Sequence, residues 1–316
     1  MGTIKAICIS DKKGTAKYGV EKAEFKVDFG IGGDAHGGNW HRQVSLLSAE
    51  TIAAFRAKGA DVQPGAFGEN LIIEGLDLKP VPVGTRFHIG EVLLEVTQIG
   101  KECHTHCAIY RVMGDCIMPR EGLFAKVLHP GTVAVGDGIS AEYPSDRSFT
   151  AAVITLSDKG SVGARVDESG PVVAELLKTA GYEVVETMLL PDEQKELEGA
   201  LINFADRRQV SLVVTTGGTG FSVRDRTPEA TLAVATRNAP GIAEAIRYGS
   251  LGITKRAMLG RGVSVIRGQT LIINLPGSVK GVRESLGFII GELEHGIRIL
   301  RGSASECGQG PVALRP

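Results

Sequence analysis

The sequence predicts two domains: a mostly β, barrel-like domain over residues 1–145 and a three-layer α/β domain with a mostly parallel sheet over 146–316. Three observations support this prediction. The chain has 316 residues, more than one hydrophobic core usually serves. A polar, proline-containing stretch over 143–148 separates the halves. The pattern also changes there, from short apolar runs between glycines to strands that alternate with helical segments.

The first half is expected to contain short strands, because its apolar runs are brief and glycine or proline separates nearly all of them. One helix is expected over 48–59. Many short strands with regular turn signals are typical of a barrel. The predicted strands cover residues 23–27, 44–47, 70–73, 86–89 and 92–96.

The second half alternates strands with helices. Apolar residues recur at helical spacing over 192–208, and another helix is expected to begin at Pro228 with Thr227 as its N-cap. This order predicts a parallel sheet, in which ligands bind beyond the C-terminal ends of the strands. The remaining predicted elements are strands over 151–156, 183–190, 211–214 and 271–274 and a helix over 170–179.

Composition narrows the class of partner. The formal net charge is −1 and no long basic run occurs, which argues against a nucleic-acid binder. No segment approaches the ~20 consecutive apolar residues of a membrane span. The N-terminus does not resemble a signal peptide, so we expect a cytoplasmic protein. Its five cysteines are then expected to stay reduced, and the ligand to be a small molecule.

A glycine-rich loop over 217–220 follows the predicted strand 211–214. Backbone N–H groups there could close around a phosphate, although a tight strand-to-helix turn explains the glycines equally well. The loop matches neither the P-loop nor the dinucleotide fingerprint. Residues 30–35 do fit G-x-G-x-x-A, but the following His-Gly-Gly-Asn cannot open a helix, so we interpret that match as accidental.

Two aspartates favour phosphate binding. Asp192 follows the strand over 183–190, and Asp225 lies just beyond the glycine loop. Both are expected on the ligand-binding edge of the sheet, where two carboxylates and substrate phosphates suit Mg²⁺. The polar loops 157–161 and 275–278 follow two other strands, so the sequence predicts an anionic ligand site.

A cysteine cluster marks the first half. Cys103, Cys107 and Cys116 lie with two histidines within 101–116. Three readings remain open: a zinc site with unusual spacing, small buried hydrophobic residues, or a functional thiol. A second segment, 33–42, is either a set of anion-binding donors that includes His36 and Arg42 or a polar surface loop.

Six motifs follow one another along the second half: Ser157-Asp158, Asp167-Glu168-Ser169-Gly170, Pro191-Asp192-Glu193-Gln194, residues 215–220, residues 225–230 and Leu275-Pro276-Gly277-Ser278. With these motifs the second half, over 150–302, resembles the MogA-type molybdopterin adenylyltransferases. The resemblance implies that the terminal phosphate of molybdopterin attacks the α-phosphate of ATP with Mg²⁺ as cofactor, and that the domain forms a homotrimer. The two important aspartates of that family match Asp192 and Asp225, as catalytic residues and Mg²⁺ ligands. The implied pterin or nucleotide contacts are Ser157, Asp158, Gly217, Gly218, Thr219, Gly220, Thr227, Glu244 and Ser278.

The first half has its own set of motifs, which are residues 33–36, 42–47, 65–71, 122–128 and 131–137 together with the cysteine cluster. With these motifs the first half, over about 3–142, resembles the MOSC domain found in molybdenum cofactor sulfurases. The resemblance implies a β-rich barrel that binds molybdenum cofactor or its sulfur, with one cysteine as the metal or sulfur ligand. Cys107 is the first candidate for the molybdenum ligand and Cys103 the second, with His36 and Arg42 as cofactor contacts.

Together the two halves predict an enzyme of molybdenum cofactor biosynthesis that passes a labile pterin between linked domains. Its partner would be a molybdenum insertase or a cofactor-accepting enzyme. Two alternatives remain: a non-catalytic pterin carrier or sulfur relay, and a nucleotide-sugar or coenzyme pyrophosphatase.

Overall fold

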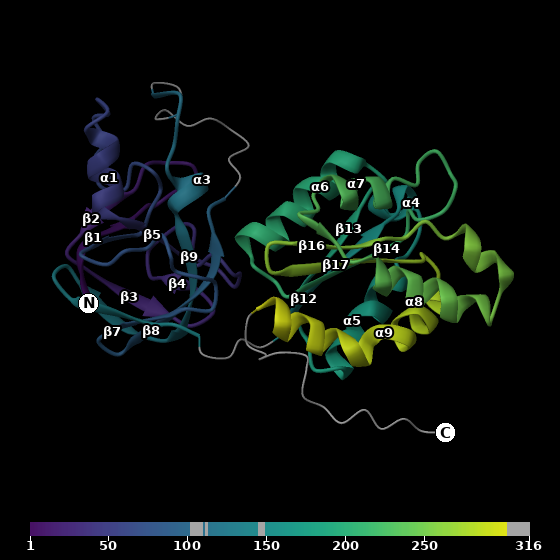
Figure 1. The fold of residues 1–316 in the computed structure, drawn as a ribbon. Coiled ribbons are helices and arrows are strands. Elements are labelled where there is room, and N and C mark those ends of the chain that lie inside the picture. The colour runs from purple at the N-terminus through teal and green to yellow at the C-terminus, as the bar shows by residue number, and fades with distance from the viewer. Residues whose placement is uncertain (102–109, 111–112, 145–148, 302–316) are drawn as a thin grey trace, which may run out of the picture. The chain divides into compact units, whose positions relative to one another are not determined.

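The computed structural model describes residues 1–101, 110, 113–144 and 149–301. Contacts between residues divide the chain into two units, Met1–Arg147 and Ser148–Pro316. Figure 1 shows both units, and each is described here by itself. The candidate ligands Cys103 and Cys107 lie outside the described residues.

The N-terminal unit contains a closed barrel. Eight strands are hydrogen-bonded in the order β11-β7-β8-β9-β5-β6-β1-β2, and β1 also pairs with β11, so seven of them form a ring. A barrel of this kind was predicted, and the closure confirms it. The strands of the ring and β2 are β1 (Gly2–Ile9), β2 (Tyr18–Val20), β5 (Val44–Ser48), β6 (Leu71–Glu74), β7 (Arg86–Ile89), β8 (Val92–Ile99), β9 (Leu123–His129) and β11 (Gly138–Glu142).

The barrel closes because its strands bury one face. Along β8, fully buried residues alternate with half-buried ones, the period-two pattern of a strand that faces a core. Phe25 and Phe87 fill the interior. Outside the ring, a three-stranded sheet combines β10 (Gly131–Ala134), β3 (Lys22–Lys26) and β4 (Gly30–Ile31), and the helices are α1 (Ala49–Arg56) and α3 (Met118–Glu121).

The C-terminal unit is built on a six-stranded sheet in the order β13-β12-β14-β17-β16-β15. The first four strands are parallel, β16 pairs antiparallel with β17, and β15 pairs antiparallel with β16 at the edge. The predicted mostly parallel sheet is therefore present. The strands are β12 (Thr150–Leu156), β13 (Glu183–Leu190), β14 (Leu212–Thr216), β15 (Arg237–Asn238), β16 (Ser264–Arg267) and β17 (Thr270–Leu275).

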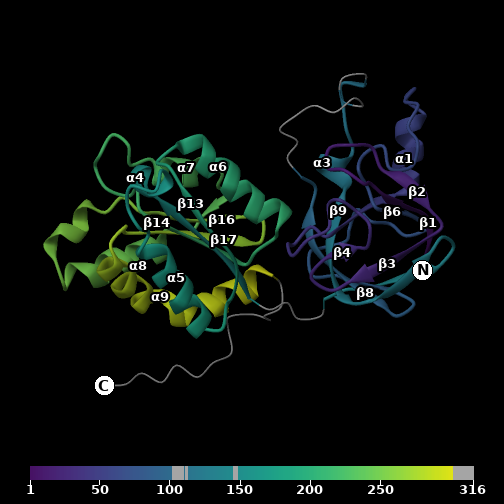
Figure 2. The same cartoon turned by 180° about the vertical axis from the view of Figure 1, so that it is seen from behind.

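Helices cover both faces of this sheet. Figures 1 and 2 show α6 and α7 on one face and α5, α8 and α9 on the other. Along β12, Ala151 and Val153 pack into one apolar cluster while Ala152 and Ile154 pack into another, as expected of a strand buried on both sides. The helices are α4 (Asp158–Ser161), α5 (Ser169–Thr179), α6 (Gln194–Ile202), α7 (Thr227–Ala233), α8 (Pro240–Leu251) and α9 (Val279–Leu300), with a π-helical turn at Asn203–Arg207 and a 3₁₀ turn at Lys255–Leu259.

Several predicted boundaries change. The strand predicted over 211–214 runs on through Thr216, whose backbone pairs with both β12 and β17. The helix predicted over 192–208 begins at Gln194 and gives way to the π-helical turn after Ile202. The helix predicted over 48–59 covers only Ala49–Arg56, and Ser48 is its N-cap, accepting a hydrogen bond from the Thr51 amide. Within the described ranges, no helix combines the length and apolar character that crossing a membrane requires.

Candidate active site

Four loops meet at one edge of the C-terminal sheet. Strands β12, β13, β14 and β17 run parallel, and the register pairs Leu156 with Leu190 and Thr216 with Leu275, so the strands end at matching heights. The loops that follow begin with Ser157, Pro191, Gly217 and Pro276. The convergence predicted from the βαβα order is therefore present in the structure.

The glycines of the 217–220 loop are required by its geometry. Gly217 has φ of 97°, and a Cβ there would lie 2.4 Å from the Leu156 carbonyl oxygen. Gly218 has φ of 62°, and its Cβ would strike the Thr227 hydroxyl. The amides of residues 218–220 donate no hydrogen bond within the described part of the chain. A tight turn thus explains the first two glycines, while the free amides remain able to bind an anion.

Thr227 has a different role from the predicted one. Helix α7 begins at Thr227 itself, and the cap position belongs to Arg226. The Thr227 hydroxyl is buried and donates to the Gly217 carbonyl oxygen over 2.9 Å, and its amide donates to the Gly218 carbonyl over 3.2 Å. The N-cap prediction is wrong because this hydroxyl holds the glycine loop onto the helix.

Asp192 and Asp158 bind each other's backbone. The Asp158 amide donates to Asp192 Oδ2 and the Asp192 amide donates to Asp158 Oδ1, each over 3.0 Å. The predicted substrate contact Asp158 is further engaged by Arg224, which donates from Nε and Nη2 over 2.9 and 2.7 Å. Arg224 Nη1 also donates to Glu193 Oε1 over 2.7 Å. These contacts fix Asp158 and leave Asp192 beside the glycine loop, where Asp192 Oδ1 would lie 3.1 Å from a Cβ on Gly218.

Asp225 approaches the same loop from its other end. Its Oδ2 accepts a hydrogen bond from the Ser222 amide over 2.9 Å and would lie 2.8 Å from a Cβ on Gly220. Arg261 supports this loop by donating to the backbone carbonyls of Gly220 and Asp225 over 2.7 and 2.6 Å. Both predicted aspartates therefore border the glycine loop.

The electrostatics of this edge suit a cation. Burial raises the pKa of Asp192, and the nearby charges of Asp158 and Asp225 raise it further. The hydrogen bond from Arg224 lowers the pKa of Asp158. Among the described residues, no group of three or more histidine, cysteine, aspartate or glutamate side chains could hold a metal ion. Two carboxylates do fit Mg²⁺, since that ion takes few protein ligands and completes its shell with water and substrate phosphates.

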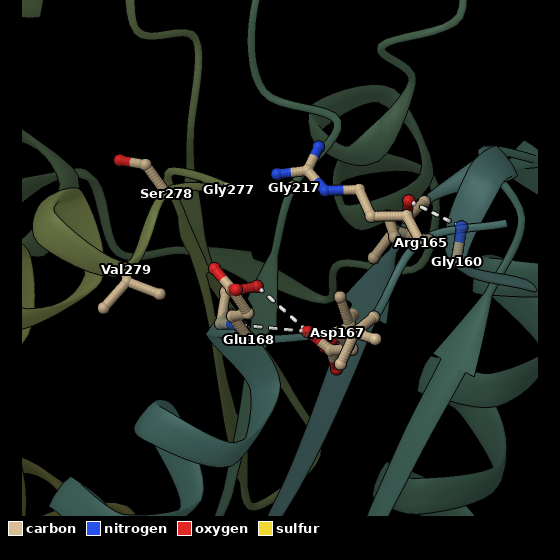
Figure 3. Close-up of a pocket in the computed structure, with 13 residues that line it drawn as sticks. Gly160, Arg165, Asp167, Glu168, Gly217, Gly277, Ser278 and Val279 are labelled. Carbon is tan, nitrogen blue, oxygen red and sulfur yellow. Dashed lines mark hydrogen bonds between the residues drawn. The ribbon is translucent and has the colours of Figure 1, made fainter. Parts of the chain in front are cut away.

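Two cavities flank the glycine loop. One of about 280 Å³, shown in Figure 3, is lined by Ser157, Arg165, Gly217 and Ser278 among others. In that view the Arg165 side chain extends toward Gly217. The other cavity, of about 560 Å³, is lined by Thr219, Gly220, Arg247, Arg256, Lys280 and again Ser278.

Of the remaining predicted substrate contacts, Ser157 and Ser278 line these cavities and Glu244 lies on the surface. Ser157 and Ser278 both cap helices, because their hydroxyls accept from the amides of Gly160 and Gly281. Glu244 lies exposed on α8 and lines neither of the two cavities, so its assignment stays a prediction.

The N-terminal unit has its own polar cavity, of about 450 Å³. It is lined by Lys17, His36, Arg42, Lys101 and Cys116 among others. The Arg42 guanidinium carbon lies 4.8 Å from the ring centre of Trp40 and 5.8 Å from that of Phe124. The structure thus places the predicted contacts His36 and Arg42 on one cavity, while Cys103 and Cys107 remain outside the described residues.

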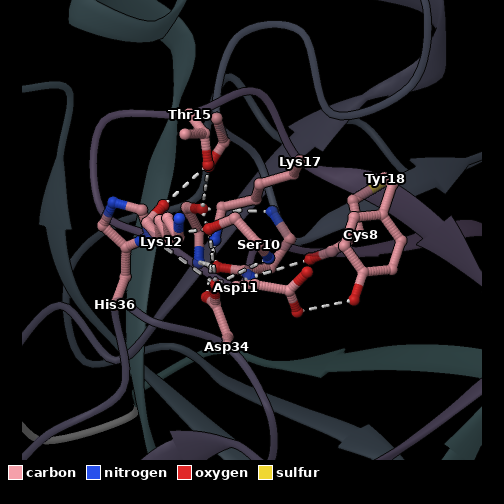
Figure 4. A network of polar contacts seen from close by, with 12 residues as sticks. Cys8, Ser10, Asp11, Lys12, Thr15, Lys17, Tyr18, Asp34 and His36 are labelled. Carbon is pink, nitrogen blue, oxygen red and sulfur yellow. Dashed lines mark hydrogen bonds and ion pairs between the residues drawn. The ribbon is translucent and has the colours of Figure 1, made fainter.

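A buried network centres on Asp34 at this cavity (Figure 4). Asp34 Oδ2 lies 2.5 Å from Lys17 Nζ and accepts from Asn70 Nδ2 over 2.8 Å, and the amide and hydroxyl of Ser10 donate to Oδ1. The Ser10 hydroxyl also lies 3.2 Å from His36 Nδ1. Although burial opposes ionisation, the hydrogen bonds from Lys17 and Asn70 lower the pKa of Asp34 to about 2.

Burial also shifts the pKa values of Lys17, His36 and Cys8 in this domain. It lowers the pKa of Lys17 despite the attraction of Asp34, and it lowers the pKa of His36. Burial also raises the pKa of the Cys8 thiol to about 12, which makes that cysteine a structural residue.

Fold and loop edge together define an α/β domain whose parallel strands end at a polar, glycine-rich edge suited to an anionic ligand. A family model described as a probable molybdopterin binding domain matches residues 152–295, and a MOSC domain model matches residues 32–140. The chain belongs to the molybdopterin adenylyltransferase family through its C-terminal half, and its N-terminal half contains a MOSC domain.

The proteins similar to this chain match its C-terminal half. The molybdopterin adenylyltransferase of Escherichia coli K12 is 45% identical over 137 residues, which cover 42% of this chain and 70% of that protein. The enzyme of the same name from Helicobacter pylori is 36% identical over 167 residues, covering 52% of this chain and 95% of its own. The crystal structure of the molybdopterin biosynthesis enzyme MoaB from Thermus thermophilus shares 44% identity, with a TM-score of 0.47 and coverage of 49% of this chain and 97% of that one.

Some residues of the site were not predicted from sequence. Arg224 and Arg261 were missed as organisers of the two aspartate loops, and Lys17 and Asn70 were missed as partners of Asp34. The position of Arg224 directly before Asp225 was a usable signal. The other three lie far along the chain from the residues they contact, and only the fold brings them there.

Proposed function

We propose that the C-terminal domain transfers AMP from ATP to the terminal phosphate of molybdopterin, with Mg²⁺ as cofactor. One observation carries the proposal: the unpaired amides of residues 218–220 lie between the carboxylates of Asp192 and Asp225 at one edge of the sheet. Amides can bind phosphate oxygens, and carboxylates can bind a cation that bridges phosphates. The names of the relatives support this assignment.

The reaction requires no protein nucleophile. A phosphate oxygen of the pterin attacks the α-phosphorus of ATP, the bond from that phosphorus to the oxygen bridging to the β-phosphate breaks, and pyrophosphate leaves. Catalysis then rests on alignment and on neutralising the developing charge. Asp192 and Asp225 would hold Mg²⁺, which supplies that neutralisation. The amides of residues 218–220 and Ser278 would hold and orient the phosphates.

The two cavities support a reaction with two substrates. They lie on either side of the glycine loop and share Ser278 in their walls. A nucleotide in one and a pterin in the other would bring their phosphates together at the loop. Trimer formation through this domain, and hand-over of product to a molybdenum insertase or cofactor-accepting enzyme, remain part of the proposal.

Product identification tests this function. The purified chain is incubated with molybdopterin, ATP and Mg²⁺, and the pterin is analysed by mass spectrometry. We expect a pterin that carries one added AMP, and none when EDTA replaces Mg²⁺ or when pterin is omitted. Bound but unmodified pterin would instead favour the alternative carrier role. Free AMP formed without pterin would indicate a pyrophosphatase.

For the N-terminal domain we propose binding of molybdenum cofactor or its sulfur. The cavity supports this, because the cationic side chains of Arg42 and Lys101 line it together with the aromatic Trp40. Such a lining fits a phosphorylated, planar heterocycle.

The predicted ligand Cys107 gives a direct test of that role. The substitution Cys107→Ser should leave adenylylation unchanged and reduce cofactor retention by the N-terminal domain, measured as molybdenum and pterin content after gel filtration. Cys103→Ser is the matched control. Loss in the Cys103 variant alone would mean that Cys103 is the ligand.

A further inference from the structure

Four carboxylates gather at the edge that carries the two aspartates. Asp192, Glu193 and Asp225 lie on the loops after β13 and β14, and Asp158 begins the short helix α4 in the connection after β12. A triphosphate would approach these four carboxylates only if most of their charge were neutralised. Arg224 pairs with two of them, Asp158 and Glu193.

Arg224 also connects the three loops. It lies on the loop after β14, directly before Asp225, and its fork binds both oxygens of Asp158 on the loop after β12. Its third contact is Glu193, directly after Asp192 on the loop after β13. The reciprocal bonds between Asp158 and Asp192 continue this connection to the second proposed Mg²⁺ ligand.

Folding stability does not account for this arrangement. The side chains of Arg224, Asp158 and Glu193 remain 50, 44 and 51% exposed. Exposed ion pairs contribute only ~0–1 kcal/mol to the free energy of unfolding. A planar fork does, however, fix the geometry of the carboxylate it binds.

We propose that Arg224 is a positioning residue that clamps Asp158 and Glu193, and thereby holds Asp192 and Asp225 at the separation that one divalent cation requires. The inference rests on the function proposed above. Arg224 acts through its neighbours, while Asp192 and Asp225 contact the cation. By pairing with the other two carboxylates, it also leaves only the metal ligands free to attract the ion.

Cation affinity gives the test a readout besides turnover. Binding of Mn²⁺ is measured by electron paramagnetic resonance in the presence of a non-hydrolysable ATP analogue and without pterin. We expect Arg224→Ala to weaken Mn²⁺ binding by about 10–100-fold, the usual effect of losing a group that orients metal ligands. Arg224→Lys keeps the positive charge but loses the planar fork. The Mn²⁺ affinity of this variant should therefore lie between that of the wild type and that of Arg224→Ala. Glu193→Gln removes a single contact and should have a smaller effect.

Arg267→Ala is the matched control. Arg267 forms an equivalent fork with Asp206, with contacts of 2.9 and 2.6 Å, away from the loop edge. This variant should bind Mn²⁺ like the wild type. Circular dichroism checks that all variants are folded, as the exposure of Arg224 leads us to expect.

Kinetics separate positioning from direct contact with the pterin. We expect Arg224→Ala to lower kcat and raise the Mg²⁺ concentration needed for half-maximal activity, with the KM for pterin changed less than about twofold. Unchanged cation affinity would overturn the inference, as would a higher KM for pterin alone or wild-type protein that binds no Mn²⁺. Arg224-dependent Mn²⁺ binding in a chain that forms no adenylylated pterin would leave the inference standing and contradict only the proposed function.

Discussion

The two domains treat a carboxylate cluster in opposite ways. In the N-terminal domain, Asp34 is buried and meets Lys17, Asn70 and Ser10, which lower its pKa to about 2. In the C-terminal domain, Asp192 lies at a half-exposed loop edge, where burial and like charges raise its pKa. Asp34 is satisfied by cationic and neutral donors within the chain, whereas Asp192 keeps an unfavourable charge that a bound cation would relieve.

This difference shows how a stabilising charge can be told from a functional one. A buried carboxylate with a cation and several donors around it holds loops together. A carboxylate that is kept close to another and has few donors stores unfavourable electrostatic energy, which a ligand can release. The two clusters should therefore respond oppositely to substitution.

The largest effect is expected for Asp34→Ala. Removal of this carboxylate leaves the Lys17 ammonium buried without its partner, so the N-terminal domain should lose ~3–5 kcal/mol of unfolding free energy. Trp40 is the single tryptophan of the chain and lies in this domain, so its fluorescence in a urea titration follows the unfolding. The matched control is Glu74→Ala, which breaks the exposed pair with Lys5 and should cost ~0–1 kcal/mol. Equal losses for the two variants would contradict the comparison.

Asp225→Asn should affect turnover instead of stability. Loss of one cation ligand should lower the rate of adenylylation at least ~100-fold, or ~2.7 kcal/mol in the activation barrier. Its unfolding free energy should stay within ~0.5 kcal/mol of the wild type. Asp206→Asn, which removes the carboxylate that Arg267 binds, controls for a change of surface charge. Turnover close to normal in Asp225→Asn would refute the metal-site assignment.

Acid should lower the unfolding free energy of the N-terminal domain by about 2 kcal/mol through protonation of Asp34. Because the folded pKa of Asp34 is lowered to about 2, its contribution is complete above the unfolded pKa of ~3.9 and disappears as pH falls toward 2. Urea titrations followed by Trp40 fluorescence should therefore show a loss of ~2 kcal/mol between pH 4 and 2. In Asp34→Asn that part of the pH dependence should be absent. An identical slope in the two proteins would show that other groups cause it.

The smallest effect is expected for Asp192→Asn. A raised pKa means that the ionised carboxylate destabilises the fold, so neutralising it should stabilise the C-terminal domain by ~0.5 kcal/mol at pH 7 in the absence of metal. The gain should shrink as pH falls through the pKa of Asp192, since the wild-type carboxyl is then protonated as well. Differential scanning calorimetry with EDTA, at pH 7 and at successively lower pH, measures the difference in stability between Asp192→Asn and the wild type. Destabilisation at pH 7 would show that Asp192 is satisfied within the chain, like Asp34.

Sequence patterns predicted the parts of the fold that local periodicity determines. The barrel strands and the parallel sheet were found from short apolar runs separated by turn residues or by helical segments, and the glycine loop was found from the glycines that follow one of those runs. The boundary at Thr216 was missed, since threonine in a buried strand resembles the polar start of a loop. The role of Thr227 was also missed, because its acceptor on Gly217 comes close only when the loop folds back.

The sequence predicted which carboxylates lie at the candidate site but not which residues hold them in place. Asp192 and Asp225 follow strands, and their meeting at one edge follows from a parallel sheet. The contacts of Arg224 with Asp158, 66 positions earlier, depend on how three loops turn after their strands. Loop conformation at that scale is set by tertiary packing, which leaves no period in the sequence.

Pyrophosphate release from the wild-type chain, followed against pterin concentration at saturating ATP and Mg²⁺, tests the central claim most directly. The account predicts release that saturates with molybdopterin, stops when EDTA removes the cation, and yields one pyrophosphate for each pterin adenylylated. Pterin binding without release would contradict the transferase assignment and leave this edge as a carrier site. Release at the same rate without pterin would contradict the proposed acceptor.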